Sequence, residues 1–143
     1  MGSNNSHGQR WQRARRQAPR VDVETLCSEI IDGTERPSMV VDLSQTGIRV
    51  ERPYRGGRTP RILQLEFELP GIDEVIWAKG ETCFDHIRQV RGSLLRTTGI
   101  RLAAAARRDL RLLRDFIFET QRAQEVADSM ESYLCFASAY ARG

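Results

Sequence analysis

The sequence has few lysines, few cysteines and no long apolar run. Lys79 is the only lysine among 22 basic residues, so positive charge is carried almost entirely by arginine. The three cysteines are odd in number and contain no Cys-x-x-Cys pair, which argues against a zinc site or a disulfide framework. No apolar run approaches the eighteen or so residues that a membrane helix needs. Met1 to Gln12 has no apolar signal-peptide core, so a cytoplasmic protein is expected.

The residues that catalysis requires are also scarce. Only two histidines are present: His7 lies near the N-terminus, and His86 follows Asp85 in a predicted turn. Ser44 has no histidine that the sequence places as an activating base. Walker-type and Gly-x-Gly-x-x-Gly phosphate loops are missing as well. We therefore expect a binding protein rather than an enzyme, with no metal and no cofactor.

Composition indicates one globular domain with an excess of arginine. The 143 residues are 40% hydrophobic and 29% charged, with a formal net charge of +3. A chain of this length builds a single core of ordinary size. Arginines cluster between Arg10 and Arg20, before the first predicted strand. The planar arginine fork binds phosphate in two places and stacks on flat rings, so an anionic, base-containing ligand is favoured.

Short alternating segments separated by turn residues predict a mainly β fold. Val21 and Val23 alternate with charged residues, and Leu65, Phe67 and Leu69 alternate with polar ones. The expected strands cover residues 20–27, 36–42, 47–51, 61–69, 75–84 and 93–102, with turns at 32–35, 53–60, 70–71 and 85–92 and a possible bulge at Gly80. Regular turns between short strands indicate an antiparallel barrel or sandwich.

A helix is predicted from Ala103 to about Ala141, because this stretch lacks proline and carries an apolar or small residue every three or four positions. The stripe consists of Leu113, Phe116, Thr120, Ala123, Ala127, Met130, Leu134, Ala137 and Ala141. The first half is expected to close the sheet, and the second half is an extension that is either continuous or broken near Asp128. The predicted organisation is a flexible tail (1–14), a domain (15–122) and a helical extension (123–143).

Two short motifs carry the functional argument. The first, Asp42-x-Ser44-x-x-Gly47, has the residue types that bind backbone amides in a turn, and its glycine permits positive φ or a close approach to the backbone. The second, Arg16-x-x-x-Arg20, contains Pro19, which prevents a helix there. In an extended chain the two arginines would span about 13 Å, which suits a dianionic ligand. Alone, each motif has an ordinary explanation, as a hairpin turn and as a solvated basic tail.

Taken together and in this order, the two motifs resemble the PilZ domain family over about residues 13–120. Thr98-Gly99-Ile100-Arg101-Leu102 also looks like the family's Gly-Val-x-Phe strand, and the arginine-rich helix after it is similar. The resemblance implies a six-stranded antiparallel PilZ-like β-barrel with a C-terminal α-helix and helical extension. It also implies binding of the bacterial second messenger cyclic di-GMP.

The resemblance implies a role for each motif residue. Arg16 and Arg20 would bind phosphates and guanine, Asp42 and Ser44 a guanine edge, and Gly47 would permit the turn. The resemblance further associates Arg15 with an intercalated ligand dimer, which implies two ligands per protomer. Weaker candidates for ligand contact are Arg13, Arg49, Trp77 and Phe84, although the two aromatic residues are expected in the core rather than at the ligand.

The resulting expectation is a receptor or adaptor. Cyclic di-GMP would order the N-terminal arginine segment, and an unidentified effector protein would detect the change. Two alternatives remain: an arginine-rich nucleic-acid-binding module, which the nearly balanced charge after residue 20 disfavours, and a structural or oligomerisation protein with the same fold. The helical stripe is rich in alanine, so a monomer or a weak oligomer is expected.

Overall fold

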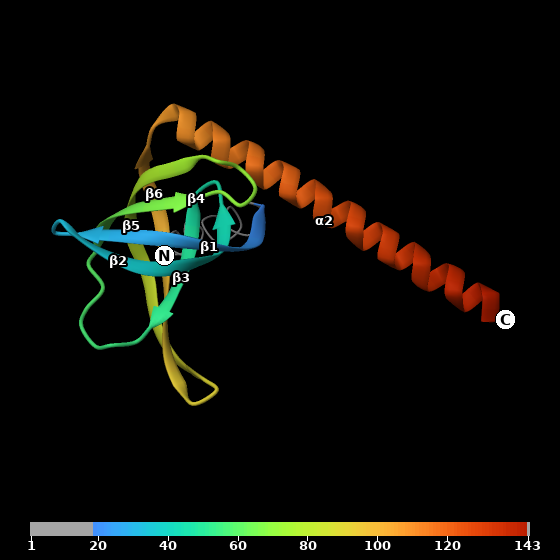
Figure 1. Cartoon of the computed structure of the whole chain (residues 1–143), viewed down its shortest axis with the longest axis horizontal. Helices are drawn as coiled ribbons and strands as arrows, with labels where there is room; N and C mark the ends of the chain where they lie inside the picture. The colour runs from blue at the N-terminus through green and yellow to red at the C-terminus, as the bar shows by residue number, and fades with distance from the viewer. Residues whose placement is uncertain (1–18, 143) are drawn as a thin grey trace, which may run out of the picture.

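The structure is a computed structural model that describes residues 19–142, and it consists of a six-stranded barrel followed by a helix (Figure 1). The elements are β1 (Arg20–Ile31), β2 (Thr34–Ser44), β3 (Gly47–Pro53), β4 (Ile62–Glu68), β5 (Val75–Val90), β6 (Ser93–Ala105) and α2 (Arg107–Arg142). The strands close in the order β1-β2-β3-β6-β5-β4, and every neighbouring pair is antiparallel. The predicted antiparallel barrel with a C-terminal helix is confirmed.

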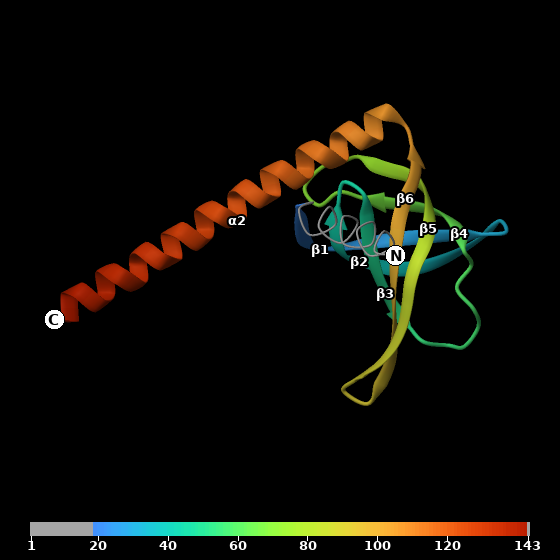
Figure 2. The ribbon, with the colours of Figure 1, turned by 180° about the vertical axis from the view of Figure 1, so that it is seen from behind.

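Alternating side chains fill the barrel. Burial follows every second residue in β3 and β4, which is the period of a strand with one solvated face. Fully buried Leu65, Phe67 and Ile76 lie in the core, together with Leu113 and Ile117 of α2. The first turns of α2 contact β1, β2 and β5, and the rest of the helix projects away from the barrel (Figure 2). The core therefore extends from the barrel interior to one side of the helix.

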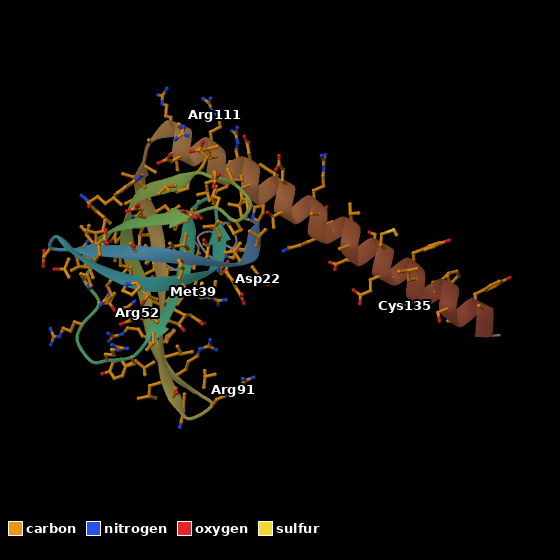
Figure 3. The ribbon with its side chains drawn as sticks, in the orientation of Figure 1. Asp22, Met39, Arg52, Arg91, Arg111 and Cys135 are labelled. Atoms are coloured by element: carbon orange, nitrogen blue, oxygen red, sulfur yellow. The ribbon has the colours of Figure 1, made fainter. Side chains whose placement is uncertain are left out.

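The strands differ from the predicted ones at two places. Residues 85–90 were expected in a turn, but β5 continues to Val90 and forms with β6 an arm that turns at Arg91 and Gly92 (Figure 3). Both turn residues have positive φ, as a two-residue hairpin requires. Ala103 to Ala105 were expected in the helix, but Ala104 and Ala105 pair with β5, so strand pairing overrides the helix propensity of alanine. The pairing register shifts between Lys79 and Gly80, where the bulge was expected, but the extra residue is Ala103 on β6.

α2 is a single continuous helix of 36 residues, so the considered break near Asp128 is absent. Asp109 in its first turn accepts a hydrogen bond from the backbone N–H of Trp77 at 3.1 Å, which ties the start of the helix to β5. None of the helical sequence in residues 19–142 is apolar enough to cross a bilayer. The three cysteines are free thiols, and Cys27 alone is buried.

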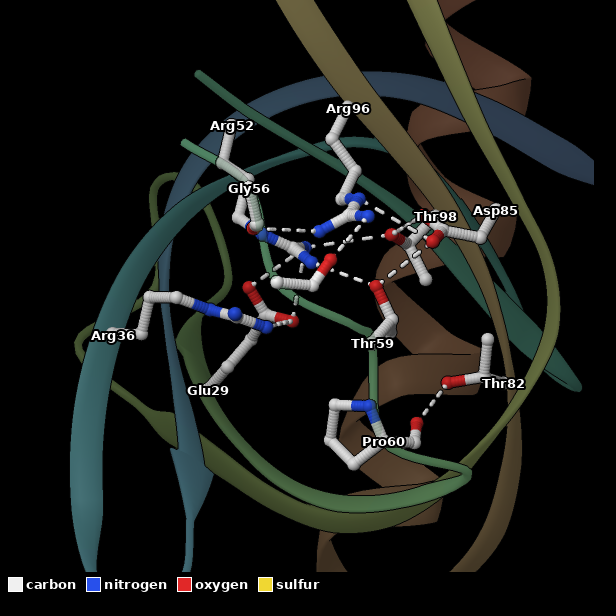
Figure 4. Close-up of polar contacts among 11 residues, drawn as sticks. Glu29, Arg36, Arg52, Gly56, Thr59, Pro60, Thr82, Asp85, Arg96 and Thr98 are labelled. Atoms are coloured by element: carbon white, nitrogen blue, oxygen red, sulfur yellow. Dashed lines mark hydrogen bonds and ion pairs between the residues drawn. The ribbon is translucent and has the colours of Figure 1, made fainter. Parts of the chain in front are cut away.

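A buried ionic cluster joins the last part of β1 to the last part of β3 (Figure 4). Glu29 is fully buried, and both of its carboxylate oxygens accept a hydrogen bond from Arg52 Nη1 at 3.3 Å. Arg36 donates to the same carboxylate at 3.3 Å. Burial lowers the pKa of Arg52, and Glu29 opposes that shift. The carboxylate therefore compensates a guanidinium that has lost most of its water.

The cluster also fixes the loop between β3 and β4. Thr59 accepts from Arg52 Nη2 at 3.0 Å and donates to Asp85 at 3.0 Å. Arg96 donates to the backbone oxygens of Gly56 and Gly57 at 3.3 and 2.9 Å. Each of these contacts joins the loop to a barrel strand. Backbone hydrogen bonds hold its two ends, from Tyr54 N–H to the Leu94 carbonyl at 2.9 Å and from Thr82 N–H to the Arg61 carbonyl at 2.8 Å.

Candidate functional site

The turn between β2 and β3 is built around the hydroxyl of Ser44. Ser44 is only 3% exposed, and its Oγ accepts from the backbone N–H groups of Thr46 and Gly47 at 3.3 and 3.0 Å. The same hydroxyl lies 3.1 Å from the Gly47 carbonyl, to which it donates. A serine oxygen in such a turn takes the place of a backbone partner. The hydroxyl is thus engaged by its own turn in this structure.

Gly47 serves the turn in the second of the two expected ways, through a close backbone approach rather than a positive φ. Its φ is not positive, unlike that of five other glycines in the described residues. A Cβ at Gly47 would instead lie 3.0 Å from the backbone oxygen of Ile100 on β6. Leu102 N–H also donates to the Thr46 carbonyl at 2.9 Å. Glycine is therefore needed because β6 approaches the turn closely.

Asp42 lies between two arginines from different strands. Its Oδ2 is 3.8 Å from Arg20 Nη1 and 3.6 Å from Arg49 Nη2. The register explains the arrangement, because Asp42 is the cross-strand partner of both Asp22 on β1 and Arg49 on β3. The Asp42 side chain is 13% exposed, whereas those of Arg20 and Arg49 are 53% and 42% exposed. One nearly buried carboxylate thus orients two half-exposed guanidinium groups.

The two guanidinium groups keep donors available. A single carboxylate oxygen beyond 3.5 Å does not satisfy the five N–H donors that each arginine carries. Arg49 Nε is buried and has no hydrogen-bond partner among the described residues. Asp22, exposed opposite Asp42, adds a second carboxylate that the sequence analysis did not single out, although the alternation around Val21 places it outward. The site can accept an anion at the arginines and offer carboxylate oxygens beside it.

Phe84 lies in the same cross-strand row as the ion pairs. Arg49 is the partner of Gly99 on β6, and Gly99 is the partner of Phe84 on β5. A Cβ on Gly99 would be 2.0 Å from Phe84 Cε1, so the ring lies over the glycine. Phe84 is 37% exposed and stacks on His86 with ring centroids 5.3 Å apart. The prediction that Phe84 packs in the core is therefore wrong. The cross-strand row from Asp42 through Arg49 and Gly99 ends at its exposed ring.

Trp77 is placed elsewhere. It belongs to the first part of β5, opposite Glu66 of β4 and next to the first turn of α2. Its side chain is 53% exposed, so the prediction of a core position is wrong for this residue too. The structure does not bring Trp77 into the row that contains Arg49.

Arg101 on β6 is the partner of Gly47 and forms an ion pair with Glu81. The hydrogen bond and the positive charge of Arg101 lower the pKa of the Glu81 carboxyl. Arg61 also approaches Glu81, at 3.5 Å. Arg101 is therefore committed to a carboxylate, and Arg20 and Arg49 are the better anion-binding candidates near the turn.

Arg13, Arg15 and Arg16 lie outside the described residues. Of the predicted ligand-binding residues, the structure brings together Arg20, Asp42, Ser44, Gly47 and Arg49, and it adds Phe84 to the same row. No group of three or more His, Cys, Asp or Glu residues in the described part of the chain is arranged to hold a metal ion.

Several solved structures share this fold at low sequence identity. The chain resembles the Bacillus subtilis inhibitor of motility MotI/DgrA, with a TM-score of 0.65 and 18% identity over 76% of this chain and 52% of that one. It resembles the PilZ domain of YcgR from Escherichia coli, solved with c-di-GMP, with a TM-score of 0.64 and 19% identity over 80% and 98%. PlzA of Borreliella burgdorferi, in complex with c-di-GMP, gives a TM-score of 0.58 and 4% identity over 87% and 57%.

The chain thus spans about half the length of MotI/DgrA and nearly all of the isolated YcgR domain. No curated protein matches the sequence. The model of the PilZ domain matches residues 14–119, which is well over half of the chain and contains both motifs. The chain belongs to the PilZ domain family.

Proposed function

We propose that this chain is a cytoplasmic cyclic di-GMP receptor without catalytic activity, and that it transmits binding to a partner protein through its N-terminal arginine segment. The observation that carries the proposal is Asp42, whose carboxylate orients Arg20 and Arg49 at the β2–β3 turn. Support also comes from relatives of the same fold, since the YcgR domain and PlzA were solved with c-di-GMP.

The chemistry of the site fits the two halves of this ligand. Phosphate oxygens accept bidentate bonds from arginine, and Arg20 and Arg49 are half-exposed with donors to spare. A guanine base donates from N1 and N2, and carboxylates such as those of Asp22 and Asp42 accept such bonds. Phe84 offers an exposed ring at the end of the same row for stacking. Ser44 contributes by holding the turn that presents Asp42.

Arg15 and Arg16 complete the proposal from the sequence. They precede Arg20 by five and four residues, and about 13–17 Å of extended chain allows them to reach a ligand that Arg20 also contacts. Charge-assisted bonds from these residues offset the entropy of ordering the segment. The ordered segment becomes a new surface for the effector protein. Arg15 provides the additional donor for a second ligand, so we propose two ligands per protomer.

Calorimetric titration of the full chain with cyclic di-GMP tests the proposal. We expect saturable micromolar binding at two ligands per protomer. Arg16→Ala and Arg20→Ala should each weaken binding by at least about tenfold, because a hydrogen bond to a charged group contributes about 1.5–3 kcal/mol. Arg111→Ala, on the exposed side of α2, is the matched control and should bind normally.

Two outcomes would contradict the proposal that this chain is a cyclic di-GMP receptor. One is the absence of saturable binding by the wild-type chain, and the other is unchanged binding by Arg16→Ala and Arg20→Ala. If the chain instead binds oligonucleotides with a steep salt dependence and ignores cyclic di-GMP, it is a nucleic-acid-binding module. If one ligand binds per protomer and the variants lose affinity as expected, only the proposal of a second ligand is contradicted.

A further inference from the structure

The projecting part of α2 is exposed on all sides. Figures 1 and 3 show this part of the helix running away from the barrel. Every residue from Arg122 to Ala141 is exposed, whereas Leu113, Phe116 and Ile117 are buried in the core. Between 123 and 141 the sequence has no lysine or arginine, so the only acid–base pair at helical spacing that this segment can form joins Glu125 to Arg122. In proteins most of the stability of a helix comes from packing of one face, and no other part of the described chain covers this segment. Burial of one face would therefore stabilise it.

One face of the segment suits such burial. At 100° per residue its acids, Glu125, Asp128 and Glu131, fall on one side. The other side is uncharged for its whole length. Its residues are Ala123, Val126, Ala127, Met130, Tyr133, Leu134, Ala137, Tyr140 and Ala141. The large ones among them are 55–82% exposed. The segment thus has the polarity of a helix with one buried side.

The central stripe of this face reads the same in both directions. Its residues are Ala123, Ala127, Met130, Leu134, Ala137 and Ala141, at separations of four, three, four, three and four. Reversal about Ser132 exchanges Ala123 with Ala141, Ala127 with Ala137 and Met130 with Leu134. We propose that two copies of this chain associate through this stripe as an antiparallel helix pair, with the two-fold axis between the helices at the level of residue 132.

The antiparallel orientation follows from where the barrel lies. Leu113 and Phe116 continue the same stripe and are covered by the chain's own barrel. A parallel partner would place both barrels on the inner side of the helix pair at one level, where they would collide. The antiparallel register pairs Ala123 with Ala141, so the contact starts six residues beyond Ile117 and clears both barrels.

The size of the contact is sufficient for a weak, specific pair. Each helix offers one aliphatic or aromatic side chain per turn, and the alanines at both ends let the axes approach to about 8 Å. Two such faces bury on the order of 1,000 Å² in total, which is the lower limit for a specific interface. The register also places the two Glu131 carboxylates on the same flank beside the axis. Their repulsion weakens the pair, so Glu131→Gln should strengthen association about two- to fivefold.

Sedimentation equilibrium of the full chain, at concentrations up to about 100 µM, measures association in the expected affinity range. We expect twice the monomer mass. Leu134→Glu should weaken association at least about 100-fold, because it buries a carboxylate at the centre of the apolar stripe. Ser132→Glu, on the acidic side, is the matched control and should remain dimeric. A monomeric wild-type chain, or dimers of Leu134→Glu as stable as wild type, would overturn the proposal.

Cysteine cross-linking tests the orientation in a Cys83→Ser, Cys135→Ser background, where the remaining Cys27 is buried. Ala127→Cys and Ala137→Cys are made separately. Only a mixture of the two should form disulfide-linked dimers, because residue 127 faces residue 137 of the partner. Two copies of residue 127 would lie about 15 Å apart, beyond disulfide reach. Cross-linking of either variant alone indicates a parallel pair and refutes the antiparallel register, as does a dimer with no cross-link in the mixture.

Discussion

Replacing Glu29 by glutamine is expected to lower the free energy of unfolding by about 3–5 kcal/mol, the range for breaking a buried ion pair. The Glu29 carboxylate is completely buried and accepts from Arg52 and Arg36 at 3.3 Å. Glutamine has the same shape but turns an N–H₂ group toward two guanidinium groups. Arg52 is 5% exposed and stays charged, because arginine does not deprotonate near neutral pH. Its charge would therefore remain buried without a counterion.

Urea unfolding monitored by circular dichroism measures this loss, which is a third or more of the stability of a typical domain. Glu35→Gln is the matched control, because Glu35 is exposed on β2 and should contribute almost nothing. Glu29→Met combined with Arg52→Met should be less destabilising than Glu29→Gln, since the buried charge of Arg52 is removed and Arg36, whose side chain is 33% exposed, is reached by water. A loss below about 1 kcal/mol for Glu29→Gln would show that the ionic cluster does not stabilise the barrel as argued.

Two further predictions concern Gly99 and Cys27. Gly99→Ala should lower the free energy of unfolding by about 1–3 kcal/mol, because its Cβ would be 2.0 Å from Phe84. In a Phe84→Ala background the same substitution should be nearly neutral. Additive effects in this double-mutant cycle would contradict the contact. Burial raises the pKa of Cys27 from 9.0 to about 12, so the unfolded chain loses this proton first as pH rises. Between these two pH values the free energy of unfolding of the wild type should fall relative to that of Cys27→Ala, by up to about 1.4 kcal/mol per pH unit. If urea unfolding gives the same pH dependence for both proteins, this prediction is wrong.

The sequence predicts the barrel well where the pattern is local. Alternation of apolar and polar residues places all six strands, and the Asp42 motif is correctly assigned to the turn between the second and third strands. The error at residues 85–90 arises because Asp85 and His86 have turn-like composition, while their strand pairing with Thr98 and Thr97 is decided by β6. Ala104 and Ala105 are assigned to a helix for the same reason, since propensity carries no information about a partner strand.

The candidate site is predictable only in part. The motif identifies Asp42, Ser44 and Gly47, yet the hydroxyl of Ser44 is used by its own turn and Gly47 is required by the approach of Ile100. The motif predicts that Ser44 binds amides of the turn, but only the path of the backbone decides that Gly47 meets a close approach from β6 rather than taking a positive φ. The exposure of Phe84 was also unpredictable, since it depends on a glycine fifteen residues away.

By itself, the sequence determines the strand periodicity, the arginine-rich segment before β1 and the uncharged face of α2, because each depends on neighbours along the chain. The tertiary structure alone decides that Asp42 orients Arg20 and Arg49, and that Glu29 is buried beside Arg52. These contacts join residues 7 to 23 positions apart on different strands. They form only when the barrel closes in one register, and a shift of one residue would turn each of these side chains to the opposite face of its strand.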